Sequence, residues 1–124
     1  MKSTKPLVYS CSGCSNVAQL ANNIAVKLDR EDKAEMSCIS GIGGNVKSLI
    51  KKLVRAKEQK QKIIAIDGCP LQCAKSCLWQ QNIVPDIYIE LSEKYGVKKR
   101  YKQDFSKDEF ISIYLEIEKT YFSS

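Results

Sequence analysis

The chain alternates between short apolar runs and longer segments in which apolar residues recur three and four positions apart. Short runs rich in β-branched residues are typical of buried strands, whereas the three-and-four spacing places apolar side chains on one face of a helix. Four strands are predicted, at residues 6–11, 33–39, 63–67 and 85–91. Four helices are predicted, at residues 17–30, 46–59, 70–81 and 107–121, and Ser106 is the expected cap of the last one. The inward face of the second helix is expected to include Val46, Leu49, Ile50, Leu53 and Val54.

Strands that alternate with helices indicate right-handed β-α-β units and a mostly parallel sheet. We therefore predict a three-layer, Rossmann-like α/β fold of about four strands, with helices on both faces, formed by a single domain over residues 1–124. The segments at residues 40–45 and 92–104 are expected to be loops or irregular. In such a sheet, the functional crevice lies at the carboxyl ends of the strands, near the point where the strand order reverses.

The strongest local signals lie between Ile63 and Cys77. An apolar run ends at Asp67 and Gly68, and Pro70 suits the first position of a helix, where its missing N–H has no cost. Cys69 is therefore the expected N-cap, where the unpaired amides and the positive end of the helix dipole favour a thiolate. The simplest role for Asp67 is to accept hydrogen bonds from amides of the local turn.

The chain has six cysteines and no histidine. It has no apolar run of the roughly 20 residues that cross a bilayer, and residues 1–6 lack a leader-like apolar segment behind them. We therefore expect a cytoplasmic protein without a membrane partner, in which the cysteines stay reduced and serve as metal ligands or redox thiols. The missing histidines remove the commonest general base and the commonest zinc ligand.

The net charge of +6 comes from basic residues gathered mainly at residues 47–62 and 98–102. The first group lacks interleaved aromatic residues, so both are interpreted as solvated faces and nucleic-acid binding is not expected. The glycine-rich residues 41–44 could hold a small anionic ligand through backbone amides, but a plain tight turn is favoured because the lysine of a phosphate-binding loop is missing. Nothing in the pattern identifies a protein partner.

Cysteines follow three of the predicted strands: Cys11 ends the first, Cys38 ends the second and Cys69 follows the third. Because carboxyl ends of parallel strands meet at one edge, we expect these thiols to converge. The favoured ligand set is Cys11, Cys38, Cys69 and Cys73, with Cys14 in reserve. Cys77 would lie roughly 12 Å along the helix from Cys69, so it is expected to be a packing residue.

Four thiolates without histidine suit a closed zinc site or an iron–sulfur cluster better than a catalytic zinc with an open position. Two other classes stay open. The first is a thiol-redox protein that uses Cys11 with Cys14, or Cys69 with Cys73. The second is an enzyme with Cys11 or Cys69 as nucleophile and an anionic substrate, for which Asp67 or a lysine would have to act as base.

Several segments, in order along the chain, resemble the DGC-domain family, small bacterial and archaeal proteins named for an Asp-Gly-Cys motif. The matching segments are Cys11-Ser12-Gly13 with Ser15-Asn16, Glu35-Met36-Ser37-Cys38 with Gly41-Ile42-Gly43-Gly44, Ile66-Asp67-Gly68-Cys69-Pro70 with Cys73, and Gly96-Val97-Lys98-Lys99. The resemblance implies zinc binding by four cysteines, which correspond to Cys11, Cys38, Cys69 and Cys73. It implies no biochemical activity, so whether the protein is an enzyme is left open.

Overall fold

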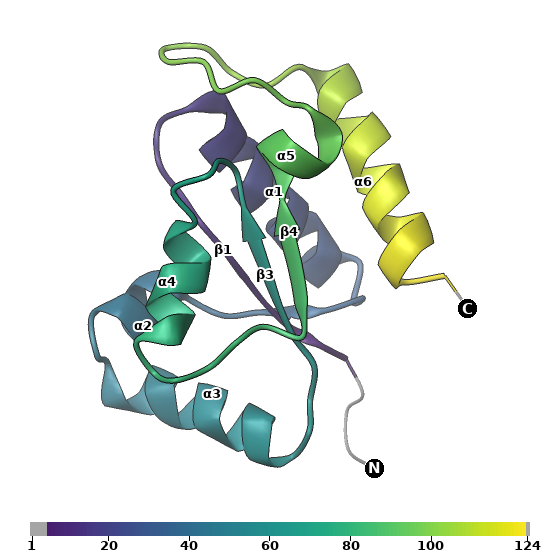
Figure 1. Ribbon diagram of the computed structural model, residues 1–124. Coiled ribbons are helices and arrows are strands. Elements are labelled where there is room, and N and C mark those ends of the chain that lie inside the picture. The colour runs from purple at the N-terminus through teal and green to yellow at the C-terminus, as the bar shows by residue number, and fades with distance from the viewer. Residues whose placement is uncertain (1–4, 124) are drawn as a thin grey trace.

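A computed structural model describes residues 5–123; residues 1–4, on which the expectation about a leader segment largely rests, and residue 124 lie outside the described part. All four predicted strands are present, as β1 (Leu7–Ser10), β2 (Glu35–Met36), β3 (Ile63–Asp67) and β4 (Ile87–Glu90). They form one parallel sheet in the order β2-β1-β3-β4, of which β1, β3 and β4 are labelled in Figure 1. The strand order therefore reverses between β1 and β3, and β4 is an edge strand, as expected from its polar alternation.

Helices cover both faces of this sheet, which confirms the predicted α/β class. They are α1 (Asn16–Arg30), α2 (Ile39–Gly43), α3 (Lys47–Glu58), α4 (Cys73–Trp79), α5 (Leu91–Tyr95) and α6 (Lys107–Tyr121). One apolar cluster joins the sheet to α1, α5 and α6, and a second joins it to α2, α3 and α4. Within residues 5–123, none of the helices has the length and apolar composition needed to span a membrane.

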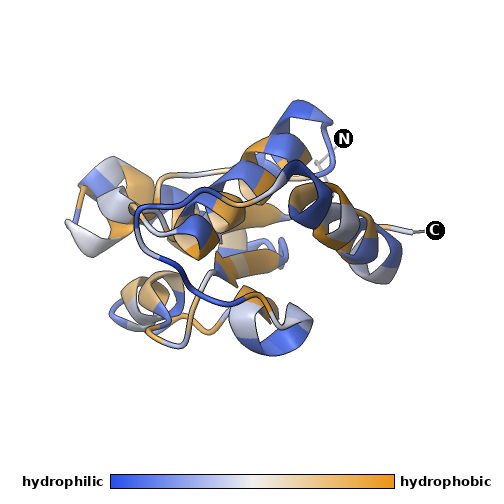
Figure 2. Cartoon of the chain, turned by 90° about the horizontal axis from the view of Figure 1, so that it is seen from above, coloured by the Kyte–Doolittle hydropathy of each residue, from blue (hydrophilic) through white to orange (hydrophobic). Residues whose placement is uncertain are grey.

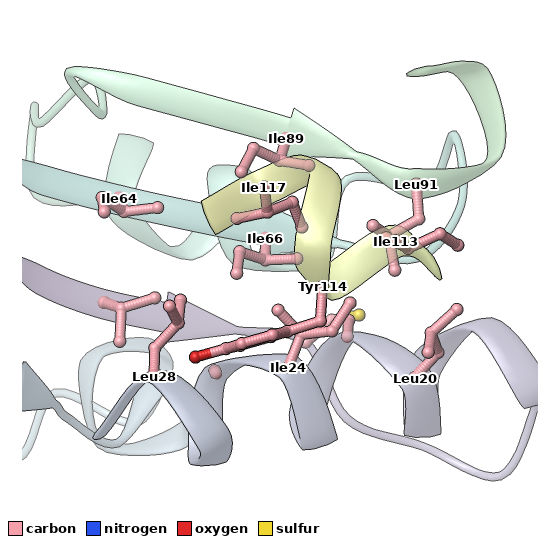
Figure 3. Close-up of a cluster of buried hydrophobic side chains, with 14 of the residues drawn as sticks. Leu20, Ile24, Leu28, Ile64, Ile66, Ile89, Leu91, Ile113, Tyr114 and Ile117 are labelled. Atoms are coloured by element: carbon pink, nitrogen blue, oxygen red, sulfur yellow. The ribbon is translucent and has the colours of Figure 1, made fainter. Parts of the chain in front are cut away.

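The central strand β3 shows why the chain has a continuous apolar run here. Ile64 and Ile66 belong to the cluster on the α1 and α6 side, whereas Ile63 and Ala65 belong to the cluster on the opposite side. Figure 3 shows Ile64 and Ile66 facing the side chains of α1 and α6. The helices around the sheet carry hydrophobic and hydrophilic residues on different sides (Figure 2), as expected for elements that cover a core.

Two short helices occur where the sequence predicts loop or irregular structure. Residues 39–43 form α2, and the segment after β4 begins with α5. The carboxylate of Glu90 caps α5 by accepting hydrogen bonds from Ser92 N at 3.0 Å and Glu93 N at 3.1 Å. Glutamate is not among the usual N-cap residues, so the pattern gave no start signal here.

Two other predictions need correction. The strand predicted at residues 33–39 is reduced to the two residues of β2, because only Glu35 and Met36 pair with β1. Val46 and Val54 do not face inward; they are 46% and 40% exposed. Helix α3 lies against the core through a narrower stripe, centred on the buried Leu53 and Ala56.

The predicted Ser106 cap is confirmed, since its hydroxyl accepts a hydrogen bond from Glu109 N at 3.0 Å.

Candidate functional site

A cavity of about 160 Å³ lies beyond the carboxyl ends of β1 and β3, where the strand order reverses. Its wall is built from the connection between β1 and α1, the connection between β3 and α4, and the segment after α5. Four cysteines line it: Cys11, Cys14, Cys69 and Cys73. The β1–α1 connection supplies Cys11 and Cys14, and the β3–α4 connection with the first residue of α4 supplies Cys69 and Cys73. The cavity lies at the place where open α/β sheets bind their ligands.

Cys11 is the buried member of this set. Its backbone N–H continues the sheet by donating to Ile66 O at 3.1 Å, and its Sγ accepts a hydrogen bond from Gly68 N at 3.2 Å. Burial raises the pKa of the Cys11 thiol to about 12, against the lowering effect of the Gly68 hydrogen bond. Cys11 is therefore a neutral thiol at neutral pH, and a bound cation would be needed to hold it as a thiolate.

Gly68 brings the two cysteine-bearing connections into contact. A Cβ at this position would lie 2.5 Å from the backbone carbon and oxygen of Val17 in the first turn of α1. Real Cβ atoms do not approach backbone that closely, so only glycine lets the β3–α4 turn sit against the start of α1. The Asp-Gly-Cys sequence at residues 67–69 therefore has a packing reason as well as a chemical one.

The start of α4 differs from the prediction, because Cys69 is not the N-cap and Pro70 is not in the helix. The helix begins at Cys73, after Gln72 in the left-handed conformation (φ 57°). Asp67 determines this start, because its carboxylate accepts hydrogen bonds from Ala74 N at 2.8 Å and Lys75 N at 3.1 Å. Asp67 therefore does accept hydrogen bonds from backbone amides, but not from those of the local turn as predicted; its partners lie seven and eight residues further along the chain.

This late start changes the geometry of two thiols. Cys69 and Cys73 do not share one face of a helix, because Cys69 precedes α4 in an irregular connection. Cys69 is partly exposed, whereas Cys73 and Cys14 are exposed. Three of the four cavity thiols are thus accessible from solvent while Cys11 forms the floor.

Cys38 and Cys77 do not line this cavity. Cys38 is the exposed N-cap of α2, after the edge strand β2, with its Sγ 3.0 Å from Ser40 Oγ. The Ser40 hydroxyl lowers the pKa of the Cys38 thiol, with a further contribution from the Gly41 amide. Cys77 packs against α2, where a Cβ on Gly43 would lie 3.0 Å from its Sγ. The packing role expected for Cys77 agrees with this contact.

The cavity thiols offer the donor chemistry of a metal site without a closed coordination sphere. Within residues 5–123, no three His, Cys, Asp or Glu side chains lie close enough together to hold a metal ion, and all six cysteines are free. Four sulfur donors, an N–H directed at Cys11 Sγ and a nearby lysine nevertheless suit a thiophilic cation. Binding would require the two connections to draw their thiols together.

Lys99 and Tyr101 complete the cavity wall, and the sequence reasoning treated both as part of a solvated basic segment. Lys99 Nζ lies 3.7 Å from Cys69 Sγ and 5.1 Å from the centroid of the Tyr101 ring. Contact with Tyr101, and then the charge of Cys69, raises the pKa of Lys99. No periodicity marks Lys99, because it lies 30 positions beyond Cys69 and reaches it only through the tertiary fold.

The comparisons with known proteins agree with the family resemblance of the sequence motifs. The DGC domain family matches residues 7–117 of the chain. The chain is 50% identical over 114 residues to the "Anaerobic and virulence modulator AnvM" of Pseudomonas aeruginosa, an alignment that covers 92% of this chain and 83% of that protein. No solved structure matches the chain. The match over residues 7–117 and the identity to this relative show that the chain belongs to the DGC-domain family.

Proposed function

We propose that this protein binds one Zn²⁺ in the cysteine cavity and that the metal-loaded form acts as a regulatory protein. The observation that supports the metal most directly is the gathering of four thiols from two distant connections on one cavity. Cysteines used only as small apolar residues would be scattered through the core. In this chain three of the four are solvent-accessible.

The proposed ligands are Cys11, Cys14, Cys69 and Cys73, so Cys14 takes the place that the sequence reasoning assigned to Cys38. The reason is the position of Cys38 at the start of α2, outside the cavity wall. Zinc bound by four thiolates has no open position, and its role would be to cross-link the two connections rather than to activate water. The chain itself would contribute the Gly68 N–H to Cys11 Sγ and the positive charge of Lys99.

The regulatory part of the proposal comes from the relative. The protein of Pseudomonas aeruginosa is described by its name as a modulator, and the present chain shares half of its residues over the aligned length. A cavity whose thiols lie on irregular connections is suited to report the presence of a metal, because binding would order both connections. The same thiols could report oxidation by forming a disulfide, which is the thiol-redox alternative.

The first experiment is metal analysis of protein purified without oxygen, together with a visible absorption spectrum, for the wild type and for Cys69→Ser. One zinc per chain, no colour, and loss of the metal in the variant are the expected results. Iron with sulfide absorption would replace zinc by a cluster. A metal-free protein under reducing conditions, which also takes up no added Zn²⁺, would contradict the proposal and favour dithiol chemistry.

A further inference from the structure

The basic segment that follows α5 forms one wall of the cysteine cavity. Sequence reasoning treats residues 98–102 as a run of equivalent solvated charges, but the structure separates them. Lys98 is exposed, Arg100 makes an ion pair with Glu109 at 3.3 Å, and Lys99 lines the cavity. Among the described residues, Lys99 is the only cationic side chain in the wall of this cavity.

The buried Asn16 holds this segment in place. Its side-chain amide donates to Lys98 O at 2.9 Å, and its side-chain carbonyl accepts from Arg100 N at 2.5 Å. Its backbone N–H also donates to Arg100 O at 3.2 Å. Asn16 is completely buried, so these hydrogen bonds do not compete with water.

The hydrogen bonds of Asn16 to residues 98 and 100 fix the backbone on both sides of Lys99 and so determine where its side chain points. With the backbone of residues 98 and 100 fixed against the first turn of α1, the side chain of Lys99 extends toward Cys69, and its Nζ lies 3.7 Å from Cys69 Sγ. The Tyr101 ring also contacts the ammonium group, with its centroid 5.1 Å from Nζ.

We propose that Lys99 is the counter-charge of the thiolate site, positioned by Asn16, and that it raises the affinity of the cavity for a divalent thiophilic cation. The inference rests on the proposed zinc site. Four thiolates and one Zn²⁺ carry a net charge of about −2, and an ammonium group at the cavity wall reduces that charge locally. Groups that surround metal ligands in this way commonly change affinity by about 10- to 100-fold.

The test measures the affinity of reduced full-length protein for Zn²⁺ alone, by competition with a chromophoric chelator. Lys99→Met removes the charge and keeps most of the length of the side chain; it is expected to weaken zinc binding by about 10- to 100-fold. Lys98→Met is the matched control, because the same charge is lost from an exposed neighbour, and it is expected to stay within about twofold of the wild type. Lys99→Arg restores the charge and is expected to recover most of the affinity.

The positioning role of Asn16 is tested by a double-mutant cycle with Asn16→Ser. If Asn16 acts through Lys99, the loss of zinc affinity caused by Asn16→Ser is largely absent when Lys99 is already methionine. A purely structural role for Asn16 would give the same loss in both backgrounds. Circular dichroism of each variant checks that it is folded, and Lys99→Gln replaces Lys99→Met if the latter is not.

The outcomes separate the inference from the proposed function. Zinc binding by the wild type with equal affinities for Lys99→Met and Lys98→Met would overturn the role of Lys99 and leave the zinc site intact. A wild-type protein that binds no zinc would overturn both. Equal losses in the two Lys99 backgrounds would overturn the positioning role of Asn16.

Discussion

Cys11 and Cys38 follow neighbouring parallel strands, but the structure gives them opposite surroundings. Cys11 is buried at the floor of a cavity and accepts a hydrogen bond from Gly68 N. Cys38 is exposed at the start of α2, and its Sγ lies 3.0 Å from Ser40 Oγ. The difference comes from strand order, because the reversal point lies between β1 and β3, whereas β2 is the edge strand on the far side of β1.

A cysteine at the carboxyl end of a parallel strand does not for that reason alone lie at a shared site. The connections after β1 and β3 border one crevice because, at the reversal point, they lead to α1 on one face of the sheet and to α4 on the other. The connection after the edge strand β2 leads instead to α2, which packs with α3 and α4 on the second of these faces and does not border the crevice between β1 and β3. Thiols from β1 and β3 therefore form one group, and Cys38 belongs to a different surface.

Replacing single cysteines by serine should produce the largest difference between the cavity and the surroundings of Cys38, measured as zinc affinity. Cys73→Ser is expected to weaken zinc binding by more than about 100-fold, because loss of a ligand exceeds the usual effect of a neighbouring group. Cys38→Ser should leave the affinity unchanged. Chelator competition on both variants measures this difference, and a loss in Cys38→Ser with none in Cys73→Ser would reverse the assignment.

In metal-free protein, the rates at which Cys11 and Cys38 react with an alkylating reagent should differ nearly as strongly. Burial holds the pKa of Cys11 at about 12, whereas the Ser40 hydroxyl lowers the pKa of Cys38. Because the thiolate is the reactive form, Cys38 should react with iodoacetamide at neutral pH about 100-fold faster than Cys11. Peptide mapping of a labelling time course checks this ratio. Equal rates would mean that the cavity floor is open to solvent.

Two glycine-to-alanine substitutions should give the smallest of the three effects, measured as a change in the free energy of unfolding. Gly68→Ala places a Cβ against the backbone of Val17 and is expected to destabilise the fold by about 2 kcal/mol. Gly41→Ala meets only the side chain of Leu49, whose tip can rotate, so it should cost less than about 1 kcal/mol. Urea unfolding measures both. Similar values would show that the start of α1 can move away from the cavity.

Much of the fold could be predicted because the core obeys simple periodicities. Residues 63–66 are predicted as a buried strand, and the apolar stripes of α1 and α6 match helical spacing, so the sheet class and a crevice at the carboxyl ends of the strands followed. The start of α4 could not be predicted, because it depends on the Asp67 carboxylate reaching the amides of Ala74 and Lys75. Pro70 was a valid local signal that this tertiary contact overrides.

The site was predictable to a similar extent. Cys11, Cys69 and Cys73 could be grouped from their positions after the central strands, and they do line one cavity. The place of Cys38 depended on strand order, which periodicity does not encode. The role of Lys99 could not be predicted, because its position results from three hydrogen bonds between Asn16 and a segment more than 80 residues away.

The most direct test of the zinc proposal is the X-ray absorption spectrum of the zinc-loaded protein at the zinc edge. The expected result is four sulfur neighbours at about 2.3 Å from the zinc ion in the wild type and in Cys38→Ser. Cys14→Ser should show fewer sulfur neighbours. A spectrum that loses sulfur in Cys38→Ser and is unchanged in Cys14→Ser would contradict the assignment of the cavity as the metal site.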